Sequence, residues 1–149
     1  QYLTQEKANE RTIEENYLNS LIFANEKVTS LVEDLFSQYD SDNLPIIVIQ
    51  GDEGPFPRRY REDEYNFDWK DEATKDELRE KMRILNAYHL PGVEDDLLYP
   101  SITPVNTFRL IFNLYFGAEY DLLPDKSYAF RDGKNIYDFF DVTDIVDYQ

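Results

Sequence analysis

The chain has 149 residues and a formal net charge of −16, because 31 Asp and Glu residues outnumber 15 Lys and Arg residues. This length suits one domain, and 42% hydrophobic residues, including 12 Tyr and 10 Phe, can build a core dominated by aromatic rings. The negative charge disfavours nucleic acids and anionic lipid surfaces as partners, since both are polyanions. The absence of cysteine excludes disulfides, thiolate metal sites and cysteine nucleophiles.

No segment of the sequence predicts membrane insertion. No apolar run approaches the length of about 18 residues that a spanning helix needs, and no secretory signal pattern opens the chain. We therefore expect the chain itself to be soluble. It begins with Gln1 instead of Met, which suggests a piece of a longer protein.

A long amphipathic helix is predicted from Thr12 to about Tyr39, after a polar lead-in over residues 1–11. Apolar residues recur there at steps of three and four, the period of one helix face. Thr12 and Glu15 have the spacing of a capping box. A polar stretch from Asp40 followed by Pro45 predicts the end of the helix.

This helix leads into a short apolar strand, Ile46–Ile49. Four consecutive β-branched residues before Gly51 are typical of a buried parallel strand that is apolar on both faces. A helix that runs into such a strand predicts an α/β fold. Asp52 and Glu53 then lie at the carboxyl end of the strand, where open α/β sheets bind ligands. A solvated acidic turn is the alternative interpretation.

Residues 55–71 are predicted to form a long surface loop, because they combine two prolines with alternating charges and show no apolar period. Such a loop is either functional or a flexible excursion. A short exposed helix is predicted over Glu72–Lys81. The apolar run that follows, Met82–Leu90, either prolongs this helix or forms a second strand.

A further helix is predicted to begin near Ser101 or Thr103, with Pro104 in its first turn and Gly117 as its stop. Because this segment is apolar nearly all round, we expect the helix to be buried or to lie beneath another layer. Downstream, the apolar segments 127–130 and 136–140 predict a carboxyl-terminal hairpin with its turn at Asp132.

Three polar side chains in these apolar segments are candidates for a function. His89, the single histidine, is either a hydrogen-bonded core residue or a metal ligand. Asn106 and Arg109 share one helix face and need partners if they are buried. Arg109 could clamp an oxyanion of a phosphate or sulfate ester, or brace a carboxylate inside the fold.

The order of these parts resembles the carboxyl-terminal part of the alkaline phosphatase and sulfatase superfamily. A helix that starts at Tyr17 enters an apolar strand ending in Gly51-Asp-Glu-Gly54, where the family usually has Ser-Asp-His-Gly. Segments 84–92 and 101–109 look like those that follow this motif in bacterial membrane-anchored sulfatase-like proteins. The resemblance covers about residues 17–128 and implies the carboxyl-terminal portion of an alkaline-phosphatase-like sandwich.

The resemblance also implies a divalent metal site. The Asp of the family motif is a metal ligand and corresponds to Asp52, whereas the following residue, normally His, is Glu53 here. An imidazole suits Zn, but a second carboxylate suits Mg, Ca or Mn. Glu53 therefore implies either a changed metal or a lost site, with Mn, Mg, Ca and Zn as the possible ions.

In such proteins the nucleophile lies far upstream, so the resemblance assigns no catalytic residue to this chain and implies that it is inactive alone. The parent protein would be a membrane-anchored, extracytoplasmic phospho- or sulfo-ester hydrolase or transferase, and its amino-terminal half would be the partner. There are two alternatives. The chain is a catalytically degenerate binding or scaffold module of the same family, or it is an independent acidic domain that binds a basic protein. A fragment is also expected to expose apolar surface and to self-associate.

Overall fold

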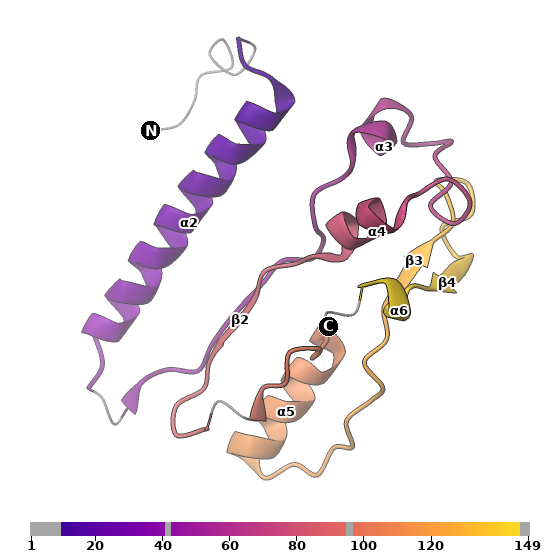
Figure 1. Cartoon of the computed structure of the whole chain (residues 1–149). Coiled ribbons are helices and arrows are strands. Elements are labelled where there is room, and N and C mark those ends of the chain that lie inside the picture. The colour runs from indigo at the N-terminus through magenta and orange to yellow at the C-terminus, as the bar shows by residue number, and fades with distance from the viewer. Residues whose placement is uncertain (1–9, 41–42, 95–96, 147–149) are drawn as a thin grey trace. The chain divides into compact units, whose positions relative to one another are not determined.

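The computed structural model describes residues 10–40, 43–94 and 97–146 of the chain (Figure 1). The predicted polar lead-in, residues 1–11, therefore lies almost entirely outside the described residues. The chain divides into two compact units, Gln1–Ile46 and Ile47–Gln149, and each is described by itself. Helices and strands are mixed, which agrees with the α/β prediction at a coarse level.

The first unit contains the long helix α2 (Ile13–Ser37). The predicted capping box is present: the backbone N–H of Glu15 donates to Thr12 Oγ1 at 3.1 Å, and that of Thr12 donates to Glu15 Oε2 at 2.8 Å. The helix ends at Gln38, whose N–H donates to the carbonyl oxygen of Leu35. The predicted helix and its amino-terminal cap are therefore confirmed.

The second unit contains two antiparallel strand pairs. In the first, β1 (Ile47–Gln50) pairs with β2 (Asn86–His89), so the run Met82–Leu90 contains a strand. The prediction of a buried parallel-type strand is wrong for β1. Its partner β2 runs antiparallel to it, and all four residues of β1 are only partly buried. A run of β-branched residues favours an extended segment, whereas the partner decides its direction and burial.

Residues 55–71 carry a large part of the core and are not a surface loop. They include the short helix α3 (Arg58–Glu62), and Tyr60, Phe67 and Trp69 are buried. The ring centroid of Trp69 lies 4.8 Å from that of Tyr60 and 5.0 Å from that of Phe67. The loop prediction is wrong because irregularly spaced aromatic residues, which show no period in sequence, converge when the chain folds back.

Helix α4 (Lys75–Met82) confirms the predicted short helix but not its exposure. Leu78 and Lys81 are both buried, each with 4% of its surface exposed. The helix begins with a second capping box, in which the N–H of Glu77 donates to Thr74 Oγ1 at 3.2 Å and the N–H of Thr74 donates to Glu77 Oε2 at 2.8 Å. One face of α4 is thus buried although its sequence is mostly charged.

Arg59 joins α3 to α4 through a bidentate ion pair with Glu77. Arg59 Nη2 donates to Glu77 Oε2 at 2.6 Å, and Arg59 Nε donates to Oε1 at 2.8 Å. The Arg59 hydrogen bond, aided by the bonds from Thr74, outweighs the opposing effect of burial and lowers the pKa of Glu77 from 4.5 to about 2. The ionised carboxylate therefore stabilises the fold.

We expect Glu77→Gln to reduce the loss of stability in acid. A carboxylate with a lowered folded pKa stabilises the protein above its unfolded pKa of 4.5, and this contribution is lost as the pH falls toward about 2. Urea unfolding at about pH 7 and about pH 3 should show a smaller pH difference in Glu77→Gln than in the wild type.

The matched control is Glu62→Gln, which removes one carboxylate from a pair with Arg58 whose side chains are 60% and 80% exposed. Because exposed pairs contribute little, this variant should keep the wild-type pH difference. Equal behaviour of the two variants would contradict the assignment.

Helix α5 (Pro104–Phe116) begins and ends as predicted. Thr103 is its N-cap, Pro104 stands in its first turn, and Gly117 is its C-cap with φ 65°. This left-handed conformation suits glycine, which has no Cβ to clash with the backbone.

No helix in the described ranges is long and apolar enough to cross a membrane.

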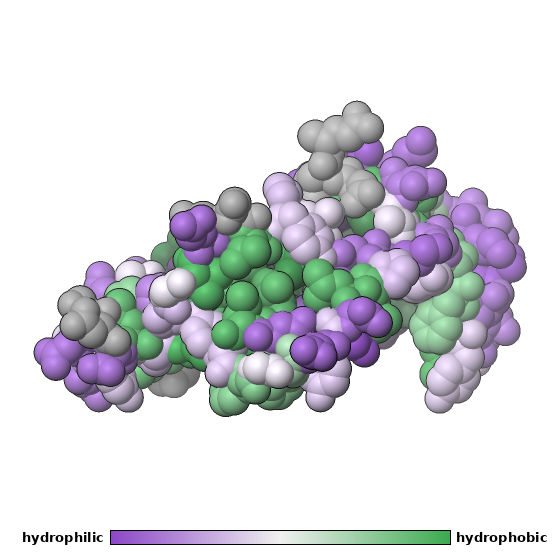
Figure 2. All heavy atoms as spheres, turned by 90° about the horizontal axis from the view of Figure 1, so that it is seen from below, coloured by the Kyte–Doolittle hydropathy of each residue, from purple (hydrophilic) through white to green (hydrophobic). Residues whose placement is uncertain are grey.

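The expectation that α5 is buried or lies beneath another layer is wrong for much of its surface. Asn106, Thr107 and Ile111 are buried, whereas Phe108 is 56% exposed and Phe116 is 68% exposed. Hydrophobic side chains are accordingly visible on the molecular surface in Figure 2. Only one face of this helix is covered, and apolar composition alone does not say how many faces a fold covers.

The second strand pair is the predicted hairpin of β3 (Tyr128–Phe130) and β4 (Phe139–Asp141), which run antiparallel. In the connection between them, Asp132 Oδ1 accepts the backbone N–H groups of the residues two and three positions on, both at 2.8 Å. Asp side chains favour turns through such local bonds. The short helix α6 (Thr143–Val146) follows the hairpin.

Candidate functional site

Asp52 and Glu53 follow β1 and line a hollow of about 430 Å³, together with residues of α4, the start of α5 and the hairpin. The Asp52 side chain is exposed, and its Oδ1 accepts the backbone N–H of Glu53 at 2.9 Å. Asp52 forms no ion pair with any residue in the described ranges. Its carboxylate is thus available to a cation that enters the hollow.

Glu53, in contrast, contacts a buried ammonium group. Lys81 Nζ donates to Glu53 Oε1 at 3.0 Å, and the exposed fractions of the two side chains are 4% and 45%. Three rings surround the same nitrogen, with centroids at 4.6 Å for Phe56, 5.0 Å for Trp69 and 5.1 Å for Phe130. Ring faces attract a cation, and the carboxylate supplies the counter-charge. We call these four residues around Lys81 the lysine cage.

The backbone around Asp52 is held against the segment that runs from α4 into β2. The N–H of Gly54 donates to the carbonyl oxygen of Lys81 at 2.7 Å, and the N–H of Gly51 donates to that of Leu85 at 2.8 Å. A Cβ on Gly54 would lie only 2.1 Å from a carbonyl oxygen in the last turn of α4, so this approach requires glycine. Asp52 therefore lies on a short loop with both ends fixed.

Among the described residues, no complete set of metal ligands surrounds the loop. No group of three His, Cys, Asp or Glu side chains suited to a metal ion occurs within residues 10–40, 43–94 and 97–146. The carboxylates of Asp52 and Glu53 fit Mg, Ca or Mn better than Zn, which usually takes nitrogen or sulfur ligands. The remaining ligands would have to come from elsewhere.

His89 is not brought to Asp52. It pairs with Ile47 at one end of the strand pair, whereas Gln50, the last residue of β1 before Asp52, pairs with Asn86 at the other end. His89 is partly buried and does not line the hollow that contains Asp52. The structure therefore does not bring His89 and Asp52 into one site, and the alternative of His89 as a metal ligand stays a prediction.

Asn106 and Arg109 bind the extended segment that follows α5. Asn106 is fully buried; its Nδ2 donates to the carbonyl oxygen of Leu123 at 2.8 Å, and the N–H of Leu123 donates to Asn106 Oδ1 at 2.9 Å. Arg109 Nη1 donates to the carbonyl oxygen of Asp121 at 3.0 Å. Neither side chain lines the Asp52 hollow. Both therefore hold backbone in place, as buried polar groups and helix-surface cations commonly do.

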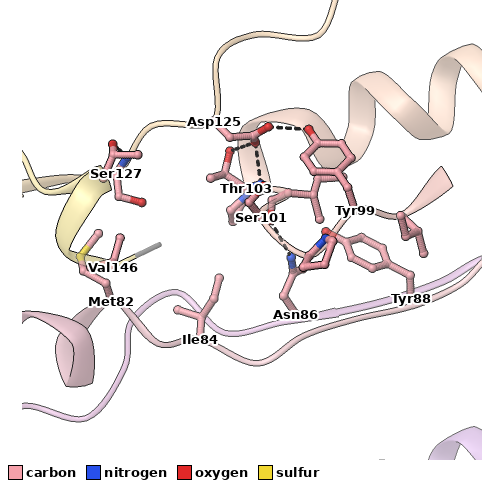
Figure 3. Close-up of a pocket in the computed structure, with 15 residues that line it drawn as sticks. Met82, Ile84, Asn86, Tyr88, Tyr99, Ser101, Thr103, Asp125, Ser127 and Val146 are labelled. Carbon is pink, nitrogen blue, oxygen red and sulfur yellow. Dashed lines mark hydrogen bonds between the residues drawn. The ribbon is translucent and has the colours of Figure 1, made fainter. Parts of the chain in front are cut away.

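A second hollow, of about 520 Å³, has Asp125 in its wall (Figure 3). The Asp125 carboxylate accepts hydrogen bonds from the N–H and the hydroxyl of Thr103, from the hydroxyl of Tyr99 and from Asn106 Nδ2. Burial raises the pKa of Asp125, but these bonds outweigh it and hold the pKa below its usual value. With four donors bound, Asp125 holds Thr103, the N-cap residue of α5, in place instead of offering a free carboxylate.

Sequence reasoning missed Lys81 and Asp125, two charged residues that line the hollows and have several specific contacts. Lys81 lies in a segment of polar composition, and its contact with Glu53 spans 28 positions. Asp125 contacts Thr103 across 22 positions. No local pattern reveals contacts of this range, although the spacing of Leu78 and Lys81 on one helix face was a weak signal for Lys81.

Comparison with known proteins does not identify a family for this chain. No protein-family model matches the chain, and neither a curated protein nor a solved structure matches it. The resemblance to the alkaline phosphatase and sulfatase superfamily therefore stays a prediction.

Proposed function

We propose that this chain is the carboxyl-terminal part of a sulfatase-like or phosphoglycerol-transferase-like ectodomain, in which Asp52 supplies one ligand to a divalent metal. The observation that carries the proposal is the exposed Asp52 carboxylate, which lies in a hollow at the end of β1 without a cationic partner among the residues described. The order of helix, strand and acidic Gly51–Gly54 loop supports it. The amino-terminal half of the parent would supply the nucleophile.

The negative charge of the chain is a reason to expect a metal ion at a site that binds an anionic ester. A phosphate or sulfate ester is anionic, and a net charge of −16 repels it. A divalent ion at Asp52 would neutralise charge on the ester oxygens and activate a hydroxyl nucleophile. Asp52 would bind the ion, and the fixed ends of its loop would hold the carboxylate in position.

A degenerate member of the same family, serving as an extracellular binding or scaffold module, is the second candidate. It is favoured by the contact of Glu53 with Lys81 at 3.0 Å, because the position that carries a ligating His in the family here takes part in an ion pair. Ester hydrolysis by the longer protein that contains this chain would contradict this second function.

Calorimetric titration with Mn, Mg, Ca and Zn tests the metal assignment. We expect Asp52→Asn to weaken binding of the preferred ion at least about tenfold, since loss even of residues that only support a ligand costs that much. The matched control is Asp121→Asn, which makes the same charge change at an exposed residue outside the hollow and should bind as the wild type does.

The same variants should then be placed in the longer protein, where all ligands of the proposed site are present. Asp52→Asn should lower both its metal content and its ester hydrolysis. Unchanged metal content and unchanged hydrolysis would remove Asp52 from the site.

A further inference from the structure

Lys81 connects the aromatic core to the loop that carries Asp52. Its side chain is 4% exposed and lies among the rings of the lysine cage, and within the described part of the chain its ion-pair partner is Glu53. A buried ammonium group needs a counter-charge, so Glu53 is held in place by the cost of leaving Lys81 unpaired. The contact therefore constrains a partly exposed loop residue from within the core.

The backbone of Lys81 holds the same loop a second time. Its carbonyl oxygen accepts the N–H of Gly54 at 2.7 Å, while its Nζ donates to Glu53 Oε1 at 3.0 Å. One residue of α4 thus binds two consecutive residues of the loop, one through its side chain and one through its main chain. Asp52 directly precedes these two residues, and its Oδ1 accepts the N–H of Glu53.

We infer that Lys81 is a positioning residue: it holds Glu53 as its counter-ion, and Glu53 thereby orients Asp52 and is not itself a metal ligand. That Lys81 orients the loop follows from the observed contacts alone. That this orientation favours metal binding rests on the proposed function. Glu instead of His at position 53 then has a structural reason, because a carboxylate supplies the negative charge that the buried Lys81 needs, whereas a neutral imidazole can only accept a hydrogen bond.

The two possible roles of Glu53 predict opposite effects of Lys81→Met. If Glu53 were a metal ligand, Lys81 would compete with the metal, and its removal would tighten metal binding. If Glu53 is the counter-ion in a positioning contact, Lys81→Met releases the loop and weakens metal binding.

Hydrogen exchange of the Gly54 amide, measured by NMR on the whole chain without metal, tests the positioning contact. We expect about tenfold faster exchange in both Glu53→Gln and Lys81→Met, because a hydrogen bond between charged groups shifts a local opening equilibrium by about that factor. Glu80→Gln makes the same charge change at an exposed neighbouring residue and should exchange like the wild type.

Unchanged exchange at Gly54 in Glu53→Gln would overturn the inference. This variant decides the question even if Lys81→Met does not fold, because Glu53 lies outside the core and its side chain is 45% exposed.

Titration of the same variants with Mn²⁺ separates the two roles of Glu53. We expect weaker binding in Lys81→Met and in Glu53→Gln, and no further loss when the two changes are combined, since they break one contact. Tighter binding in Lys81→Met would overturn the assignment of Glu53 as a counter-ion. Unchanged Mn²⁺ binding in Asp52→Asn would contradict the proposed metal function. The hydrogen-exchange result would still decide whether Lys81 and Glu53 position the loop.

Discussion

Trp69→Ala should lower the free energy of unfolding by about 4 kcal/mol, within the range found when a large buried aromatic side chain is removed. Trp69 has no exposed surface, and its ring lies against Tyr60, Phe67 and Phe130. The substitution leaves a cavity at the centre of these rings and removes one wall of the lysine cage. It should therefore destabilise both the core and the loop that carries Asp52.

Urea denaturation followed by circular dichroism measures this change. Tyr137→Ala removes a large ring that is 84% exposed and should change stability by at most about 0.5 kcal/mol. Trp69→Phe should cost less than Trp69→Ala because it keeps part of the ring packing and removes an indole N–H that has no acceptor in the residues described. Equal costs for Trp69→Ala and Tyr137→Ala would contradict the central place of Trp69 in the core.

Gly54→Ala should lower the free energy of unfolding by about 3 kcal/mol, the upper part of the range for overpacking. The added Cβ would lie 2.1 Å from the carbonyl oxygen of Glu80 and 2.7 Å from that of Lys81. Backbone oxygens of a helix cannot move aside without breaking the last turn of α4. The loop must therefore shift away from the helix, which also breaks the hydrogen bond from the Gly54 N–H and displaces Asp52.

Gly51→Ala is the matched control, in the same loop and with the same added methyl group. Its Cβ would meet its nearest neighbour at 3.6 Å, an ordinary contact, and Gly51 is not among the glycines with positive φ. We expect a cost below about 1 kcal/mol for this variant. Thermal or urea unfolding that gives the two variants the same stability would contradict the close approach of Gly54 to α4.

Elements whose ends depend on nearby residues could be predicted. Thr12 and Glu15 lie three positions apart, and their reciprocal hydrogen bonds start α2 as expected. Gly117 ends α5 in the conformation that glycine favours. The position of Asp52 directly after a strand also followed from its neighbours.

The aromatic core could not be predicted from residues 55–71. Tyr60, Phe67 and Trp69 follow neither the helical nor the strand period, and charged residues separate them. They are buried because the hairpin and α4 supply the other side of the same core, with Ala129 and Leu78 in the buried cluster. A segment that looks like a loop in isolation becomes core when distant segments cover it.

The sequence by itself determined the caps, the helix ends, the hairpin and an acidic loop after an apolar strand, because these features depend on residues a few positions apart. Tertiary structure decided that β1 pairs antiparallel, that α5 is covered on one face only, and that Glu53 meets Lys81. These outcomes depend on which distant segments pack together. The burial of Lys81 shows the reason most directly, since a charged side chain enters the core only where rings and a carboxylate from other segments surround it.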